Sequence, residues 1–174
     1  GCTFSDNGSH GAYFSYVSGA VTFKGNTVTG NSGYGLYIDG SETPLSSSTG
    51  NTFSGNGSGA ASVLAGCLAG FTGNTISGNK GSGIAVHRNA QADVIGNMIN
   101  ANGGDGIAVS FGSGVNFDSE PRKDGPNQGQ GNAGYAVKCA AGGYVDGPLG
   151  TLAGAVYDPS RDEMFAAGRG RGTT

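Results

Sequence analysis

A short phrase repeats along this chain at nearly constant spacing. It reads Gly-Asn-x-apolar-x-x-Asn, and the copies occupy residues 25–31, 50–56, 73–79 and 96–102, with a worn copy at 1–7. Counted from residue 2, the second position of the phrase recurs every 23 to 25 residues. Repeats of this length are typical of solenoids, in which each turn buries its apolar side chains only against its neighbours.

Each repeat also shows the two-residue alternation of a β-strand. The fifth and seventh residues after the second Asn of the phrase are apolar in successive repeats: Ala12 and Phe14, Leu36 and Ile38, Ala61 and Val63, Ile84 and Val86, Ile107 and Val109. A further apolar strand precedes each Gly-Asn pair, and the apolar residue of the phrase belongs to a third. Three short strands per turn, joined by Gly and Asn corners, predict a parallel β-helix.

The Asn residues of the phrase are predicted to stack in two rows. Successive turns would lie about 4.8 Å apart, which lets stacked side-chain amides hydrogen bond to one another. One row would contain Asn26, Asn51, Asn74 and Asn97, and the other Asn31, Asn56, Asn79 and Asn102. We interpret these residues as structural.

The phrase, followed by Gly-x-Gly-apolar-x-apolar as in residues 81–86, resembles the repeat of right-handed parallel β-helix proteins of the pectate-lyase-like superfamily. The resemblance covers residues 1–142 and implies an all-β fold, a right-handed parallel β-helix of about six coils. Members of the superfamily include polysaccharide lyases, glycoside hydrolases, uronan epimerases, phage tailspikes and secreted surface proteins. The repeat indicates the fold and not the activity, because function belongs to sites added to the coils.

The regularity weakens toward the ends of the chain. The sequence opens inside a coil without an initiator Met, so we expect further coils or another segment upstream. Residues 143–174 leave the repeat and are predicted to form a C-terminal cap or junction, with a short helix near 159–167 and a flexible tail. Two insertions, at 40–50 and 117–128, are expected to be either recognition loops or plain solvated loops, and the second replaces the expected sixth phrase.

Composition excludes several partners. Charged residues make up only 12% of the chain, the formal net charge is −3, and no basic stripe is present, which argues against nucleic acid. No apolar run reaches about 18 residues, so no membrane span is predicted. The cysteines at positions 2, 67 and 139 lack a repeating spacing and are expected to be small buried apolar residues.

The sequence does not assemble a catalytic or metal site. Asp39, Asp93 and Asp105 occupy different positions of the repeat. Neither the paired carboxylates of a hydrolase nor the converging oxygen ligands of a calcium-assisted lyase can be built from them. We therefore predict no cofactor and no metal. His10 and Asp105 share one repeat position four turns apart, and both are interpreted as solvated corner residues.

Candidate binding residues lie on the outward face of the second strand of each turn. Tyr13 and Tyr37 would stack in adjacent turns, Asp39 follows Tyr37 on the same face, and His87 with Arg88 comes two turns later. Aromatic rings beside polar groups suit sugar rings. Asp39 and His87 would be separated by two strand spacings, about 10 Å, which is too far for a direct acid–base pair. Alternatively, the tyrosines only cover the sheet or meet a neighbouring subunit.

These features predict an extracellular or surface-exposed interaction module, adhesin-like or tailspike-like. Its partner would be a polysaccharide or cell-surface glycan, and a homotrimer or larger assembly is one expected form. A second hypothesis is a polysaccharide-active enzyme, a lyase, epimerase or hydrolase, whose site is completed elsewhere. A third is a structural spacer. The full-length reading frame would discriminate among them, because it would show upstream acidic clusters or flanking trimerisation segments.

Overall fold

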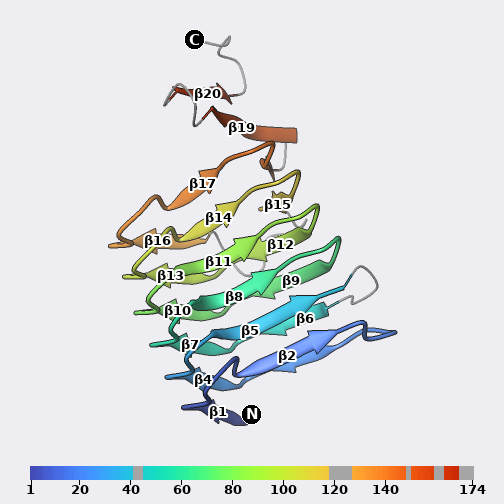
Figure 1. The fold of residues 1–174 in the computed structure, drawn as a ribbon, viewed down its shortest axis with the longest axis vertical. Coiled ribbons are helices and arrows are strands. Elements are labelled where there is room, and N and C mark those ends of the chain that lie inside the picture. Colours follow the sequence, from blue (N-terminus) through green and yellow to red (C-terminus); the bar gives the residue numbers. More distant parts are fainter. Residues whose placement is uncertain (41–44, 118–126, 148–149, 159–162, 169–174) are drawn as a thin grey trace.

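The chain forms a parallel β-solenoid whose successive turns are stacked along one axis (Figure 1). This computed structural model describes residues 1–40, 45–117, 127–147, 150–158 and 163–168. Every helix or strand found in those ranges is a β-strand. The predicted all-β parallel β-helix is therefore confirmed as a fold class.

The first sheet contains the apolar residue of each repeated phrase. Its strands are β1 (Thr3–Ser5), β4 (Thr27–Thr29), β7 (Thr52–Ser54), β10 (Thr75–Ser77), β13 (Met98–Asn100) and β16 (Gln128–Gln130), all paired in parallel. Val28, Phe53, Ile76 and Ile99 stand in register, each with at most 2% of its surface exposed. The predicted buried row is confirmed.

The second sheet contains the alternating pairs recognised in the sequence. Its strands are β2 (Ala12–Ser15), β5 (Tyr34–Asp39), β8 (Gly59–Val63), β11 (Ser82–Val86), β14 (Ile107–Val109) and β17 (Val137–Cys139). Leu36 pairs with Ala61 and Ile38 with Val63, and all four are fully buried. Because side chains alternate along a strand, the residues between these pairs point outward.

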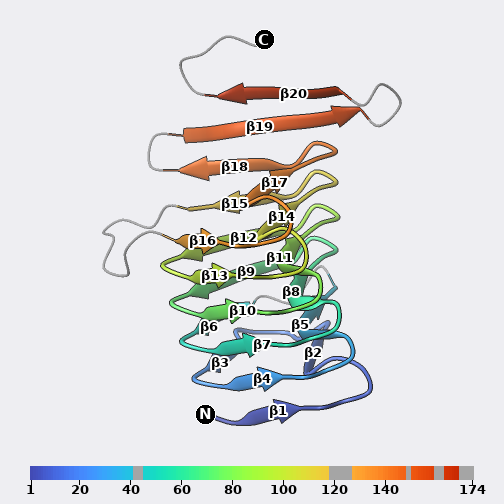
Figure 2. The same cartoon turned by 90° about the vertical axis from the view of Figure 1, so that its left-hand side faces the viewer.

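The third sheet closes each turn. Its parallel strands are β3 (Thr22–Lys24), β6 (Leu45–Thr49), β9 (Leu68–Thr72), β12 (Gln91–Ile95), β15 (Gly114–Asn116) and β18 (Tyr144–Gly147). Two antiparallel strands, β19 (Gly150–Asp158) and β20 (Glu163–Gly168), extend this sheet beyond β18 (Figure 2). The parallel stacking therefore continues through β18, inside the segment predicted as a cap.

The helix predicted near 159–167 is wrong where the structure describes that segment. Strand β20 occupies Glu163–Gly168 and pairs with β19 from Asp158↔Glu163 to Ala153↔Gly168. The Asp-Pro start signal is local, whereas pairing with an existing sheet edge satisfies a whole row of backbone groups. Residues 159–162 and the predicted tail at 169–174 lie outside the described residues.

Both predicted Asn rows are present. In each rung the backbone N–H and the side-chain Nδ2 of one Asn donate to Oδ1 of the Asn in the next turn, at 2.8–3.2 Å in the buried rungs. The Nδ2 groups also donate to backbone carbonyls inside the solenoid, as Asn74 does to Ser48. The rows therefore bind neighbouring turns together and satisfy buried polar groups.

The two insertions are only partly described. Residues 118–126 lie outside the described residues, but Asn127 accepts hydrogen bonds from the N–H and Nδ2 of Asn97. Asn127 is therefore the fifth Asn of the first row and lies in the sixth turn, although no sixth phrase is visible in the sequence. In the other insertion, β6 occupies Leu45–Thr49, and residues 41–44 lie outside the described ranges.

The cysteines follow the prediction only in part. Cys67 and Cys139 are buried, and Cys67 Sγ donates a 2.8 Å hydrogen bond to the Gly40 carbonyl. Cys2 is exposed, so its predicted burial is wrong. It stands in the first-Asn place of the first described turn, where its backbone N–H donates to Asn26 Oδ1 of the following turn.

Candidate functional site

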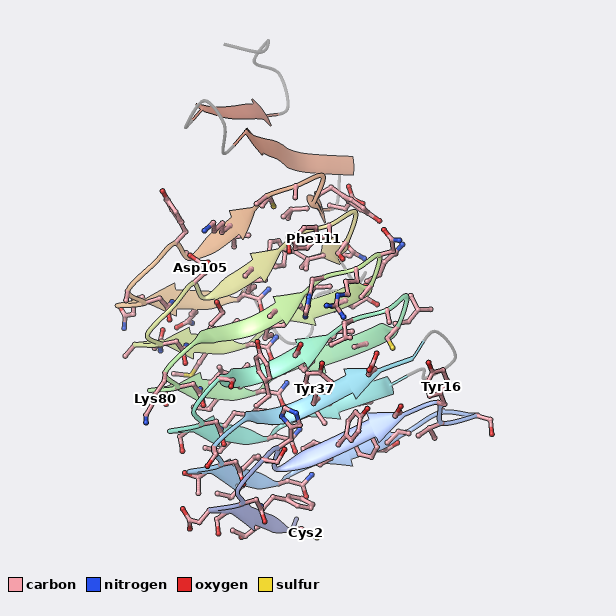
Figure 3. The ribbon with its side chains drawn as sticks, viewed as in Figure 1. Cys2, Tyr16, Tyr37, Lys80, Asp105 and Phe111 are labelled. Atoms are coloured by element: carbon pink, nitrogen blue, oxygen red, sulfur yellow. The ribbon has the colours of Figure 1, made fainter. Side chains whose placement is uncertain are left out.

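Four rings gather on the outer face of the second sheet, over β2 and β5. We call this cluster the aromatic platform and define it as His10, Tyr13, Tyr34 and Tyr37. His10 stacks on Tyr37 with ring centroids 4.4 Å apart and planes 17° apart, and Tyr13 meets Tyr37 edge to face at 5.4 Å. The Tyr34 and Tyr37 centroids lie 5.8 Å apart. Figure 3 shows Tyr37 over this face of the sheet.

The repeat itself brings these rings together. Tyr13 and Tyr37 occupy the same repeat position and pair directly between β2 and β5. His10 and Tyr34 occupy another shared position, and the Tyr34 backbone N–H donates a 3.0 Å hydrogen bond to His10 Nδ1. Tyr13 is 56% exposed, so the platform offers an aromatic surface to solvent.

Glycines in the next turn make room for two of the rings. A Cβ at Gly33 would lie 2.6 Å from His10 Nδ1, and a Cβ at Gly59 would lie 3.0 Å from Tyr34 Cε1. Each ring therefore covers a glycine of the following turn. A side chain at either position would displace the ring, so the glycines help to set the shape of the platform.

A polar chain connects the platform to the histidine two turns away. Burial raises the pKa of Tyr34 and a side-chain hydrogen bond with Ser62 lowers it, and Ser62 Oγ lies 3.0 Å from His87 Nε2. Ser62 is fully buried, whereas His87 is partly exposed. These three side chains therefore connect β5, through the buried Ser62 of β8, to His87, the residue after β11.

The charges of Asp39 and Arg88 act on Tyr37 of the platform and on His87. Burial lowers the pKa of His87, Arg88 lowers it further, and Asp39 raises it. Burial raises the pKa of Tyr37, and Asp39 adds to that effect while Arg88 opposes it. The predicted separation of Asp39 from His87 thus does not isolate the two electrostatically. Both charged side chains influence the tyrosine and the histidine.

Arg88 is held at a corner with unusual backbone geometry. Its φ is +61°, and the equivalent corner residues Tyr16 and Phe111 have φ of +50° and +54°. Such left-handed conformations are uncommon for residues other than glycine. The corner exposes all three side chains, and Tyr16 and Phe111 are labelled in Figure 3. Arg88 is therefore presented at the edge of the second sheet next to His87.

Five residues around this site were predicted from their repeat positions. Tyr13, Tyr37, Asp39, His87 and Arg88 lie on or beside the outer face of the second sheet, as expected. His10, interpreted as a solvated corner residue, is instead stacked on Tyr37, so that interpretation is wrong.

The missed residues are His10, Tyr34 and Ser62. The shared repeat position of His10 and Tyr34 could have predicted that the two side chains lie side by side in neighbouring turns. Asp105 has the same repeat position and accepts a hydrogen bond from the Tyr135 backbone N–H.

The geometry limits the chemistry that these residues can perform. The Ser62 hydroxyl is hydrogen bonded to His87, but the complete burial of Ser62 keeps a substrate from reaching that hydroxyl. Among the described residues, no group of three His, Cys, Asp or Glu side chains is arranged to hold a metal ion. No helix in the described ranges is long and apolar enough to cross a membrane.

Residues 1–142 match the sequence family described as the right-handed β-helix region. The chain belongs to this right-handed β-helix family. The match covers every residue of the aromatic platform and ends just before β18. No curated protein and no solved structure matches the chain.

Proposed function

We propose that this right-handed β-helix is an interaction module whose aromatic platform binds a carbohydrate chain. The observation that supports the proposal is the gathering of four rings on the outside of the second sheet, where they add nothing to the solenoid core. Exposed residues held on a rigid scaffold are common binding positions. The solenoid supplies that scaffold through its Asn rows and buried apolar rows.

The chemistry of the platform fits a sugar ring. A pyranose presents a face of C–H groups to an aromatic ring and hydroxyl groups around its edge. Tyr13 and Tyr37 would take the C–H face, while Asp39 and Arg88 supply an acceptor and a donor for hydroxyls. The proposal places the protein outside the cell or on a surface, where polysaccharides are met, as an adhesin-like or tailspike-like module. Assembly into a homotrimer would repeat the platform and raise its avidity.

The alternative of a polysaccharide-active enzyme is supported by one observation. Ser62 Oγ lies 3.0 Å from His87 Nε2, and burial lowers the pKa of His87, which favours the neutral imidazole that a general base requires. Within the described residues, the groups around His87 are Ser62, Asp39 and Arg88, and Ser62 is buried. An enzyme would therefore need further groups from another part of the protein or a neighbouring subunit.

Binding of the wild-type protein to an array of bacterial, plant and animal glycans tests the proposal. On a glycan that binds, Tyr37→Ala should weaken affinity about tenfold, because it removes the ring that contacts the other three. Phe111→Ala is the matched control, since Phe111 is also exposed but lies at a corner away from the platform. An array without any wild-type binding, or equal losses in the two variants, would contradict the proposal.

His87→Ala separates binding from catalysis. If the module only binds, incubation with the bound polysaccharide gives no shortened or unsaturated products from either protein. Depolymerisation by the wild type that His87→Ala abolishes would favour the enzyme instead.

A further inference from the structure

Ser62 lies under the outer face of the second sheet and contacts both ends of the polar chain. Its repeat position is the one that holds Tyr13 and Tyr37 in earlier turns and Ala85 in the next. Its side chain is nevertheless fully buried, in part because the Tyr34 ring crosses the turn above Gly59. A buried hydroxyl needs at least one hydrogen-bond partner, and the Ser62 hydroxyl, which can both donate and accept, has polar neighbours on two sides.

The single proton of Ser62 couples its two neighbours. When His87 Nε2 is unprotonated, Ser62 O–H donates to it at 3.0 Å, and Tyr34 O–H can donate to Ser62 Oγ. When Nε2 carries a proton, it donates to Ser62 Oγ, and Ser62 then donates to the Tyr34 oxygen. The direction of the Tyr34 hydroxyl is thereby linked to the protonation of His87.

We propose that Ser62 is a positioning residue that fixes Tyr34 against His87 and so joins the aromatic platform to the charged corner at Arg88. The role of Ser62 in positioning Tyr34 for carbohydrate rests on the proposed function. The coupling between Tyr34 and His87 does not. The simpler explanation is that Ser62 is small only to accommodate the Tyr34 ring. In that case its hydroxyl would transmit nothing between the two residues.

Several charged and titratable groups surround Tyr34, Ser62 and His87. A test must separate their effects on the Tyr34 signals from that of His87. Asp39 and Arg88 act on His87. On the other side, the groups near Tyr34 are His10, which accepts its backbone N–H, and Tyr37 with Tyr13 in the same cluster. A response of Tyr34 to pH can therefore come from His10 as well as from His87.

An NMR titration of the intact chain separates these contributions. In the wild type, the Tyr34 ring signals should shift at the pH where His87 titrates, and His87→Gln should remove that step while leaving any His10 step. Ser62→Ala should remove the same step and change the pH at which His87 titrates. A Tyr34 step at the pKa of His87 that survives in Ser62→Ala would overturn the proposal, as would its absence from the wild type.

The matched control is Ser113→Ala. Ser113 is also fully buried and accepts a 3.1 Å hydrogen bond from the Ala90 backbone N–H, but it lies at a corner away from the platform. It should leave the Tyr34 and His87 titrations unchanged. Ser62→Thr, which keeps the hydroxyl, should restore the coupling even if its added methyl group lowers stability.

Carbohydrate affinity supplies the second readout. On a glycan bound by the wild type, Ser62→Ala should weaken affinity about three- to tenfold, the range expected for lost hydrogen bonds, whereas Ser113→Ala should not. Wild-type affinity in Ser62→Ala would overturn the positioning role while leaving the proposed function intact. An absence of wild-type binding would contradict the proposed function, and the titration alone would then decide the coupling.

Discussion

The backbone N–H of Tyr34 donates a 3.0 Å hydrogen bond to Nδ1 of His10, across the boundary between two turns. A backbone N–H can only donate, so Nδ1 of His10 must be unprotonated in this arrangement. His10 also stacks on Tyr37. The neutral imidazole of His10 therefore helps to hold the first described turn against the second, and protonation of His10 should lower the stability of the fold.

We predict that the protein loses stability as the pH falls below about 6.5, the ordinary histidine value. Burial lowers the pKa of His10, so in this window the unfolded chain binds a proton that the folded chain does not. The contribution is fully present above the unfolded pKa and declines until the pH reaches the folded pKa. Urea unfolding at several pH values would measure the decline.

His10→Asn separates this effect from that of His87, whose pKa is lowered in the same direction. The Asn carbonyl oxygen can accept the Tyr34 N–H without titrating, so the variant should show a shallower decline than the wild type. The Tyr34 amide signal should also lose its response to acidification. An amide signal in the wild type that does not change between about pH 8 and about pH 5 would contradict the account.

Asn74→Ala should destabilise the solenoid by about 1–3 kcal/mol. Oδ1 of Asn74 accepts from the N–H and Nδ2 of Asn51, and its own Nδ2 donates to the Ser48 carbonyl and to Asn97. The change would leave buried partners in both neighbouring turns unsatisfied. Denaturant unfolding measures the difference.

The control for the Asn rows needs a residue outside them. Asn89 is exposed but has a φ of +61°, so alanine there would strain the backbone, and Asn89→Gly is the suitable variant. It should change stability by no more than about 0.5 kcal/mol. Equal losses in Asn74→Ala and Asn89→Gly would show that the row does not hold the turns together.

Ile76→Ala should cost about 2–5 kcal/mol, because Ile76 is fully buried between Phe53 and Ile99. The neighbouring Thr75 points outward in the same strand and is exposed, so Thr75→Ala should change stability by less than about 0.5 kcal/mol. Thermal or denaturant unfolding of the pair would test whether the alternation in the phrase reports burial. A small effect at Ile76 would contradict the register of the first sheet.

The solenoid could be predicted because its signals are local and repeated. The two-residue alternation and the position of each Asn recur every turn, so that errors in one repeat are corrected by the others. Asn127 shows the limit, since the row reaches it through a 30-residue step, in place of 23 to 25, from Asn97. Its equivalent place is revealed by its hydrogen bonds with Asn97 and by the pairing of β13 with β16, and not by the sequence spacing.

The site could be predicted only in part, because it depends on the orientation of side chains. Tyr13 and Tyr37 share a repeat position, and their contact followed from register alone. Ser62 shares that position too, but it is buried in part because the Tyr34 ring lies over Gly59. The spacing of the repeats does not predict this placement of the ring. The strand β20 escaped prediction for a related reason, since its partner β19 determines its conformation more than its own residues do.

Gly59→Ala should disturb the platform, although the substitution adds only one methyl group. A Cβ at this position would collide with the Ser82 carbonyl oxygen and approach Tyr34 Cε1 to 3.0 Å, and the φ of Gly59 is +143°, which disfavours any side chain. The carbonyl belongs to the backbone of the next turn and cannot move aside without distorting β11. We therefore expect a loss of about 1–3 kcal/mol and a displaced Tyr34 ring.

Two other glycines separate the causes of that loss. Gly19 has a φ of +114° with nothing within 4 Å of its Cβ position, and Gly8 has open space without a positive φ. Gly19→Ala should show the backbone strain alone, and Gly8→Ala should be neutral or slightly stabilising. Gly59→Ala should exceed Gly19→Ala in denaturant unfolding and, unlike it, change the ring signals of Tyr34 and the titration of His87. If Gly59→Ala and Gly19→Ala are equally stable and the Tyr34 signals do not move, the glycine does not shape the platform.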